Sequence, residues 1–119
     1  MTNQLQGQIL YTGVTAVYTP WMPVRGDFAT FGVEVLENSS ASLTWQVETR
    51  TKESVTPSTL LATAVTFTSG QSGVKVAVND DSTNTMQELV RYKFSTGGTK
   101  GTTNFVMFRA LQPSWRTDR

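Results

Sequence analysis

The sequence predicts an all-β protein, and three observations support that fold class. Apolar and small polar residues alternate along most of the 119-residue chain from Gln8 to Leu111, most regularly between Leu43 and Thr49. A strand directs successive side chains to opposite faces, so a period of two predicts half-buried strands and gives a helix no apolar stripe. Thr and Val, which favour strands, are abundant. Turn segments rich in Gly, Pro, Asn and Ser interrupt the alternation every 10–14 residues or so, at roughly the spacing expected of short strands.

The first quarter of the chain is expected to contain two short strands, at residues 7–12 and 14–19, with a bulge or bend at Gly13. Residues 20–26 break the alternation. Their two prolines hold the backbone in extended or turn geometry, so an ordered loop that displays Trp21 and Met22 is expected. A strand follows at residues 28–36.

The middle of the chain continues with a strand at residues 43–51, where Leu43, Trp45 and Val47 are expected to face the core. This strand is predicted to form a hairpin with the preceding one. Residues 60–68 are ambiguous, because they could begin as a helical turn, but they are expected to be mostly strand. Residues 74–78 form the next predicted strand, in which valines alternate with Lys75 and Ala77.

The last part resumes the alternation at residues 89–96, with Val90, Tyr92 and Phe94 expected inward. A Gly-rich segment leads to residues 104–111, which are predicted to complete a final hairpin. About eight to nine strands without a crossover helix favour a two-sheet antiparallel β-sandwich or a small jelly roll. The prediction is a single domain over residues 1–119 with a C-terminal tail at 112–119.

Composition excludes several functional classes. The chain has no Cys and no His, so it lacks disulfides, thiolate metal sites, a cysteine nucleophile and the usual general base. Ten basic against nine acidic residues give a net charge of +1, from which no nucleic-acid partner is expected. The N-terminus shows no signal peptide and no apolar run approaches the ~18 residues of a membrane span, so synthesis in a cytoplasm without a membrane partner is expected.

Catalytic and metal motifs are equally weak. Glu34 and Glu48 are expected on the solvent faces of paired strands, where carboxylates are usually part of a hydrated surface. The polar loop at residues 79–84 does not follow the calcium-loop pattern, residues 97–102 do not follow the phosphate-loop spacing, and Arg25-Gly26-Asp27 is typical of a turn. Neither an enzyme nor a cofactor is predicted, and whether the 79–84 loop binds a cation stays open.

Apolar residues that break the alternation are the candidate functional residues. Residues 105–111 are apolar on both faces, which either a central strand covered on both sides or burial against another chain would explain. Trp115 lies beside Arg116 in a tail expected outside the regular strands, and Trp, Met and Arg are enriched in protein interfaces. We therefore predict a subunit contact that is lost, with the β-sheet signal retained, when Trp115 is replaced by Ala or the chain is truncated after Leu111. The predicted interface consists of Trp21, Met22, Arg25, Phe105, Met107, Leu111, Trp115 and Arg116.

The whole chain resembles the capsid decoration, or cement, proteins of tailed bacteriophages. The resemblance lies in its length, its Thr/Val-rich all-β pattern, its Gly/Ser/Thr hairpins and its apolar loop and tail. The resemblance carries no diagnostic motif. It implies a structural virion protein on the capsid surface, assembled in the host cytoplasm as a homotrimer or homodimer, that binds between major capsid protein subunits and stabilises the head. Two alternatives remain open. One is a carbohydrate-binding module that uses Trp21, Trp45 or Trp115, and the other is a different phage component, such as a head–tail or tail protein.

Overall fold

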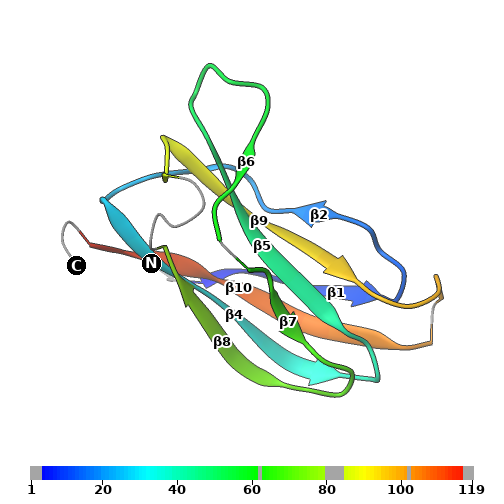
Figure 1. Cartoon of the computed structure of the whole chain (residues 1–119). Coiled ribbons are helices and arrows are strands. Elements are labelled where there is room, and N and C mark those ends of the chain that lie inside the picture. Colours follow the sequence, from blue (N-terminus) through cyan, green and yellow to red (C-terminus); the bar gives the residue numbers. More distant parts are fainter. Residues whose placement is uncertain (1–3, 62, 80–84, 102, 117–119) are drawn as a thin grey trace.

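Two antiparallel β-sheets pack face to face in the computed structural model, so the predicted all-β sandwich is confirmed (Figure 1). The structure describes residues 4–61, 63–79, 85–101 and 103–116, with side chains from Gln8 onward. These residues form ten strands and no helix, where about eight to nine strands were predicted. Within the same residues, no helix is long and apolar enough to cross a membrane.

One sheet has four strands in the order β1-β10-β4-β8. They are β1 (Gln4–Tyr11), β10 (Phe105–Arg116), β4 (Phe28–Asn38) and β8 (Gly73–Val78). The other sheet has six strands in the order β2-β9-β5-β6, with β3 also paired to β9 and β7 to β5. They are β2 (Val17–Tyr18), β3 (Met22–Pro23), β5 (Leu43–Arg50), β6 (Ser58–Thr59), β7 (Val65–Phe67) and β9 (Leu89–Thr96).

Both predicted hairpins are wrong, because β4 and β5 lie in different sheets and so do β9 and β10. The apolar sides of β4 and β5 face each other across the core instead of lying side by side. The chain changes sheet at a tight turn, in which Ser40 has a positive φ of 59° and the Asn38 side chain accepts a hydrogen bond from the Ala41 amide at 2.9 Å. Strand β5 pairs with β9 instead, from Leu43 opposite Thr96 to Arg50 opposite Leu89.

Several predicted boundaries also change. Among residues 60, 61 and 63–68, which the structure describes, only Val65–Phe67 is strand. Leu60 and Leu61 are buried core residues in a loop, because Gln46 satisfies the backbone there: its side-chain oxygen accepts from the Leu61 amide at 3.0 Å and its nitrogen donates to the Leu61 carbonyl at 3.3 Å. The predicted 14–19 strand shortens to Val17–Tyr18. The tail predicted outside strands is part of β10 as far as Arg116.

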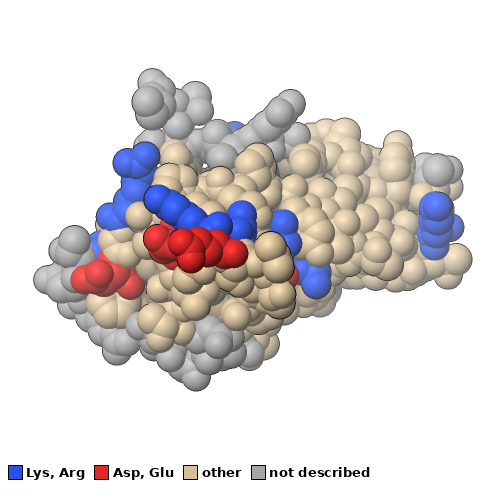
Figure 2. Space-filling model, turned by 90° about the horizontal axis from the view of Figure 1, so that it is seen from above, with Lys and Arg blue, Asp and Glu red and all other residues tan. Residues whose placement is uncertain are grey.

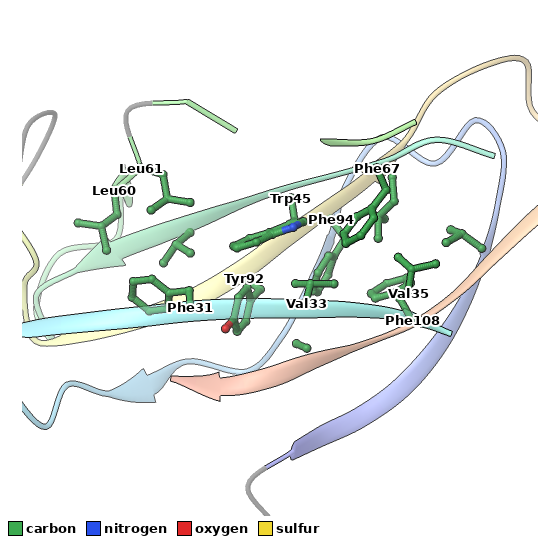
Figure 3. Packing of buried hydrophobic residues seen from close by; sticks show 14 of the residues in the cluster. Phe31, Val33, Val35, Trp45, Leu60, Leu61, Phe67, Tyr92, Phe94 and Phe108 are labelled. Atoms are coloured by element: carbon green, nitrogen blue, oxygen red, sulfur yellow. The ribbon is translucent and has the colours of Figure 1, made fainter. Parts of the chain in front are cut away.

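The core lies between the two sheets and is centred on aromatic rings (Figure 3). Tyr92 is fully buried and contacts Phe31 edge-on at 6.1 Å, Trp45 at 5.7 Å and Phe94 in a stack at 5.8 Å between ring centroids. The predicted inward residues of β5 and β9 are all buried, which confirms that part of the prediction. They are Leu43, Trp45, Val47, Val90, Tyr92 and Phe94.

The bend at Gly13 is a close approach of two backbones, and it supports a stability prediction. Gly13 has a φ of +85°, and a Cβ there would lie 2.4 Å from the Cα of Lys100. We expect Gly13→Ala to lower the free energy of unfolding by about 1–2 kcal/mol more than Gly70→Ala, measured by urea unfolding. Gly70 is the matched control, because its φ is +79° but its Cβ would meet nothing within 4 Å. Equal losses in both variants would contradict a steric role for Gly13.

Candidate interaction surfaces

Strand β10 alternates between the core and an outer face of the sandwich. Val106, Phe108 and Ala110 are buried in the core, while Phe105, Met107 and Leu111 are half-buried on the opposite side. Neighbouring strands extend this outer side with large apolar residues that are 43–60% exposed. We call the outer surface of the four-stranded sheet the apolar face; it comprises Ile9, Tyr11, Leu36, Val74, Val76, Val78, Phe105, Met107 and Leu111.

Cross-strand contacts make the apolar face continuous over β1, β10 and β4. The Tyr11 and Phe105 rings meet edge-on with centroids 6.4 Å apart. In the next row, Ile9 lies opposite Met107. An open depression of about 380 Å³ is lined there by Gln8, Ile9, Leu36 and Met107.

Gly32 extends this continuity from β10 to β8. A Cβ on Gly32 would lie 3.1 Å from the Leu111 side chain and 3.3 Å from the Val76 side chain. These two side chains therefore close over the glycine from the strands on either side. A larger residue at this position would push them apart, so the missing side chain lets Leu111 and Val76 approach each other across β4.

One ion pair lies within the apolar face. Arg109 of β10 donates to Glu34 of β4 through Nε at 2.7 Å and Nη2 at 2.5 Å. Because each charge neutralises the other, this part of the face can be covered without leaving an isolated charge. Glu48 lies on the other sheet and contacts Arg91, so the expectation that Glu34 and Glu48 share paired strands is wrong.

The outer surface of the six-stranded sheet is different, and we call it the charged face. Arg91 donates to Glu48 at 2.9 Å, and its guanidinium lies 3.9 Å from the Tyr18 ring centroid and 4.3 Å from that of Trp21. Arg50 also lies over Trp21, at 4.7 Å. Figure 2, which views the molecule from above relative to Figure 1, shows Lys and Arg gathered beside Asp and Glu over one half of the surface.

The predicted interface residues do not form one surface. Phe105, Met107 and Leu111 lie on the apolar face, whereas Trp21 lies on the charged face. Met22, in β3, is half-buried against the core and pairs with Val90 of β9.

Two of the remaining predicted residues lie at the C-terminal end of β10, and the third, Arg25, lies in the loop before β4. Trp115 lies opposite Ala29 of β4, is half-buried against the core and meets the Phe31 ring edge-on at 6.4 Å. Arg116 is exposed at the end of the strand, and Arg25 is exposed in the loop before β4. Placing Trp115 in a tail outside the strands was therefore wrong, because a shift of pairing register between Leu111 and Ser114 lets β10 continue along β4.

Sequence reasoning missed the residues that extend the apolar face beyond β10. These residues are Ile9, Tyr11, Leu36, Val74, Val76 and Val78. In β8 the side opposite the valines faces the second sheet, where Lys75 donates to the Thr66 carbonyl at 2.7 Å and lies 5.2 Å from the Phe67 ring centroid. The position of Lys75 between two valines was the available signal that the valines could face outward. A lysine can face the core side of an edge strand, because its methylenes cover apolar surface while its amine reaches a polar atom.

The described residues offer few candidates for a metal site or a catalytic site. They contain no group of three or more His, Cys, Asp or Glu that could hold a metal ion. In the polar loop at 79–84, for which the sequence left cation binding open, residues 80–84 lie outside the described residues. A hollow of about 240 Å³ on the charged face includes Glu48 and Lys93, but Glu48 is already held by Arg91.

Comparisons of the chain with family models, with curated proteins and with solved structures found no match. The chain is an antiparallel β-sandwich with one apolar and one charged outer face. Its function is therefore inferred from these two surfaces.

Proposed function

We propose that the protein is a non-enzymatic structural protein of a virion, a capsid decoration protein that binds between major capsid subunits and stabilises the head. The observation that carries the proposal is the apolar face. Contiguous exposed apolar surface of this kind is typical of a site that another protein covers. The proposed location is the capsid surface, with assembly in the host cytoplasm, and no cofactor or nucleic acid takes part.

The energetics suit a protein that binds in many copies. Fully burying a large aliphatic or aromatic side chain contributes about 1.5–3 kcal/mol. The side chains of the apolar face are already partly covered by their neighbours, so each would contribute only part of that amount. Several such contacts give modest affinity for one copy, and linked copies on a repeating lattice gain avidity.

The geometry of the tryptophans favours this proposal over a carbohydrate-binding module. Sugar stacking requires an open aromatic ring face. Trp45 is buried, Trp115 packs against the core, and two guanidinium groups lie over Trp21. A head–tail or tail protein could use the same apolar face, so binding to separated virion parts distinguishes that alternative.

The test of the proposal is a charge placed on the apolar face. Ile9 is 51% exposed and lines the depression beside Met107. We expect the wild-type chain to sediment with purified expanded heads of the phage that encodes it. Ile9→Glu should weaken binding about tenfold or more, because covering the face would then bury an unpaired carboxylate.

Val55→Glu is the matched control, because Val55 is 92% exposed in the loop between β5 and β6, which belong to the sheet that does not carry the apolar face. It should bind heads like the wild-type chain. Binding to purified tails and not to heads would move the function to the tail. Retention on polysaccharide resin without binding to any virion part would overturn the proposal.

A further inference from the structure

The free edge of the four-stranded sheet directs backbone hydrogen-bonding groups outward. In the described part of the chain, β8 is the last strand at this edge. The Asn79 amide donates to the Ala29 carbonyl of β4 at 3.0 Å, and alternate residues of an antiparallel strand face the same side. Ala77 and Lys75 therefore also face β4, so Val74, Val76 and Val78 direct their N–H and C=O groups away from the sheet.

This edge lacks several of the features that usually protect an exposed strand. Protected edges carry prolines, bulges or charged residues, including lysines that point inward. Strand β8 contains no proline and pairs with β4 in one continuous register from Gly73 to Val78. Its one charged residue, Lys75, does point inward, but its amine already donates to the Thr66 carbonyl and lies over the Phe67 ring of the other sheet, so a strand added at this edge would not leave that charge without a partner. By contrast, the pairing of β1 at the opposite edge is interrupted by a register shift between Gln4 and Gly7.

We propose that β8 pairs antiparallel with β8 of a second copy about a two-fold axis through Val76. This inference rests on the proposed function and deepens it, because the two apolar faces would join into one broader surface. The contact is isologous and uses the β8 edge of both copies, so it closes as a dimer.

The sequence of β8 is what points to a second copy. Val74-Lys75-Val76-Ala77-Val78 keeps its alternation of valines when read in either direction. With the axis on Val76, Val76 faces its own equivalent and Val74 faces Val78 of the partner subunit. Each such pair can exchange both backbone hydrogen bonds and gains contact between β-branched side chains. Lys75 would lie opposite Ala77 of the partner subunit, so no two lysines are directly opposed.

The test uses charges of opposite sign at the axis. We expect the wild-type chain to be a dimer by sedimentation equilibrium at micromolar concentration. Val76→Lys and Val76→Glu should each be monomeric, because like charges would face each other directly. An equimolar mixture of the two variants should recover the dimer, since lysine then faces glutamate. Val55→Lys and Val55→Glu make the same charge changes in an exposed loop and should keep the wild-type mass.

A second variant tests the backbone pairing itself. Val76→Pro removes an N–H that points away from β4, so the bonds between β8 and β4 stay intact while the edge loses a donor. We expect a folded monomer by circular dichroism and sedimentation. A wild-type monomer, a trimer, or a dimer that persists in Val76→Lys and Val76→Pro would overturn the β8 contact.

Ile9→Glu separates this inference from the proposed function. That variant should bind heads more weakly and remain a dimer, because Ile9 lies in β1, away from the β8 edge. If Ile9→Glu dissociates the dimer while Val76→Lys does not, the copies meet through the apolar face and edge pairing is wrong. A dimer that behaves as expected but does not bind heads would support the inference on its own and contradict the proposed function.

Discussion

Replacing Tyr92 by Phe is expected to lower the free energy of unfolding by about 2–4 kcal/mol, even though the aromatic ring is retained. Tyr92 belongs to β9, and its hydroxyl crosses the core to the opposite sheet (Figure 3). There it accepts from the Gly32 amide at 3.1 Å and donates to the Leu111 carbonyl at 2.7 Å. The hydroxyl lies where the register of β10 on β4 shifts, and Tyr92→Phe would leave both backbone groups without this partner.

Urea unfolding of the wild-type chain and Tyr92→Phe measures this loss. Tyr18→Phe is the matched control, because Tyr18 is 42% exposed on the charged face and its ring would still stack on Arg91. That variant should change stability by less than about 0.5 kcal/mol. A similarly small effect of Tyr92→Phe would show that the strands readjust to bond each other directly.

Stability at high pH gives an independent check on Tyr92. Burial raises the pKa of the Tyr92 hydroxyl well above its usual value near 10, and the hydrogen bond from Gly32 opposes this only in part. The unfolded chain therefore loses the proton first as pH rises. The stability contributed by the neutral hydroxyl is complete below pH ~10 and declines as pH rises from there toward the native pKa. The difference between the wild-type chain and Tyr92→Phe should therefore be smaller at pH 11 than at pH 8.

Strand positions and core-facing residues could be predicted in β5 and β9, because one side of each strand is apolar and the other polar. Trp45 and Tyr92 are buried as this pattern requires. Strand pairing could not be read from the same pattern. A hairpin and a turn that crosses between sheets both place the apolar residues of two consecutive strands in the core, so alternation does not distinguish them.

The apolar face illustrates a second limit of periodicity. In β10 both sides are apolar, so the sequence left open whether another part of the sheet or another chain covers Met107. In β8 the alternation does not show that the valines face outward, since core packing usually favours the side with the larger apolar residues. Lys75 faces the core side because the second sheet supplies both a ring and a carbonyl for it, and those groups come from a distant segment.

Trp115→Ala is expected to lower the free energy of unfolding by about 3 kcal/mol, at the lower end of the range for loss of a core tryptophan because the side chain is only half-buried. The indole packs against the core and meets the Phe31 ring at an interplanar angle of 84°. Truncation after Leu111 should destabilise the fold further, because it also removes the pairing of Ser114 with Thr30 and of Arg116 with Phe28. The structure thus leads us to expect loss of fold stability, where the sequence predicted loss of assembly with the strands intact.

Thermal and urea unfolding, followed by circular dichroism, separate these two expectations when particle mass is measured in parallel. Arg116→Ala is the neighbouring control, because Arg116 is exposed and should change stability by less than about 0.5 kcal/mol. If Trp115→Ala unfolds like the wild-type chain but dissociates, the indole contributes to a subunit contact as the sequence predicted. If it loses stability and keeps its mass under folding conditions, Trp115 acts within the subunit, because the indole closes the end of the sandwich where β10 runs beyond its register shift.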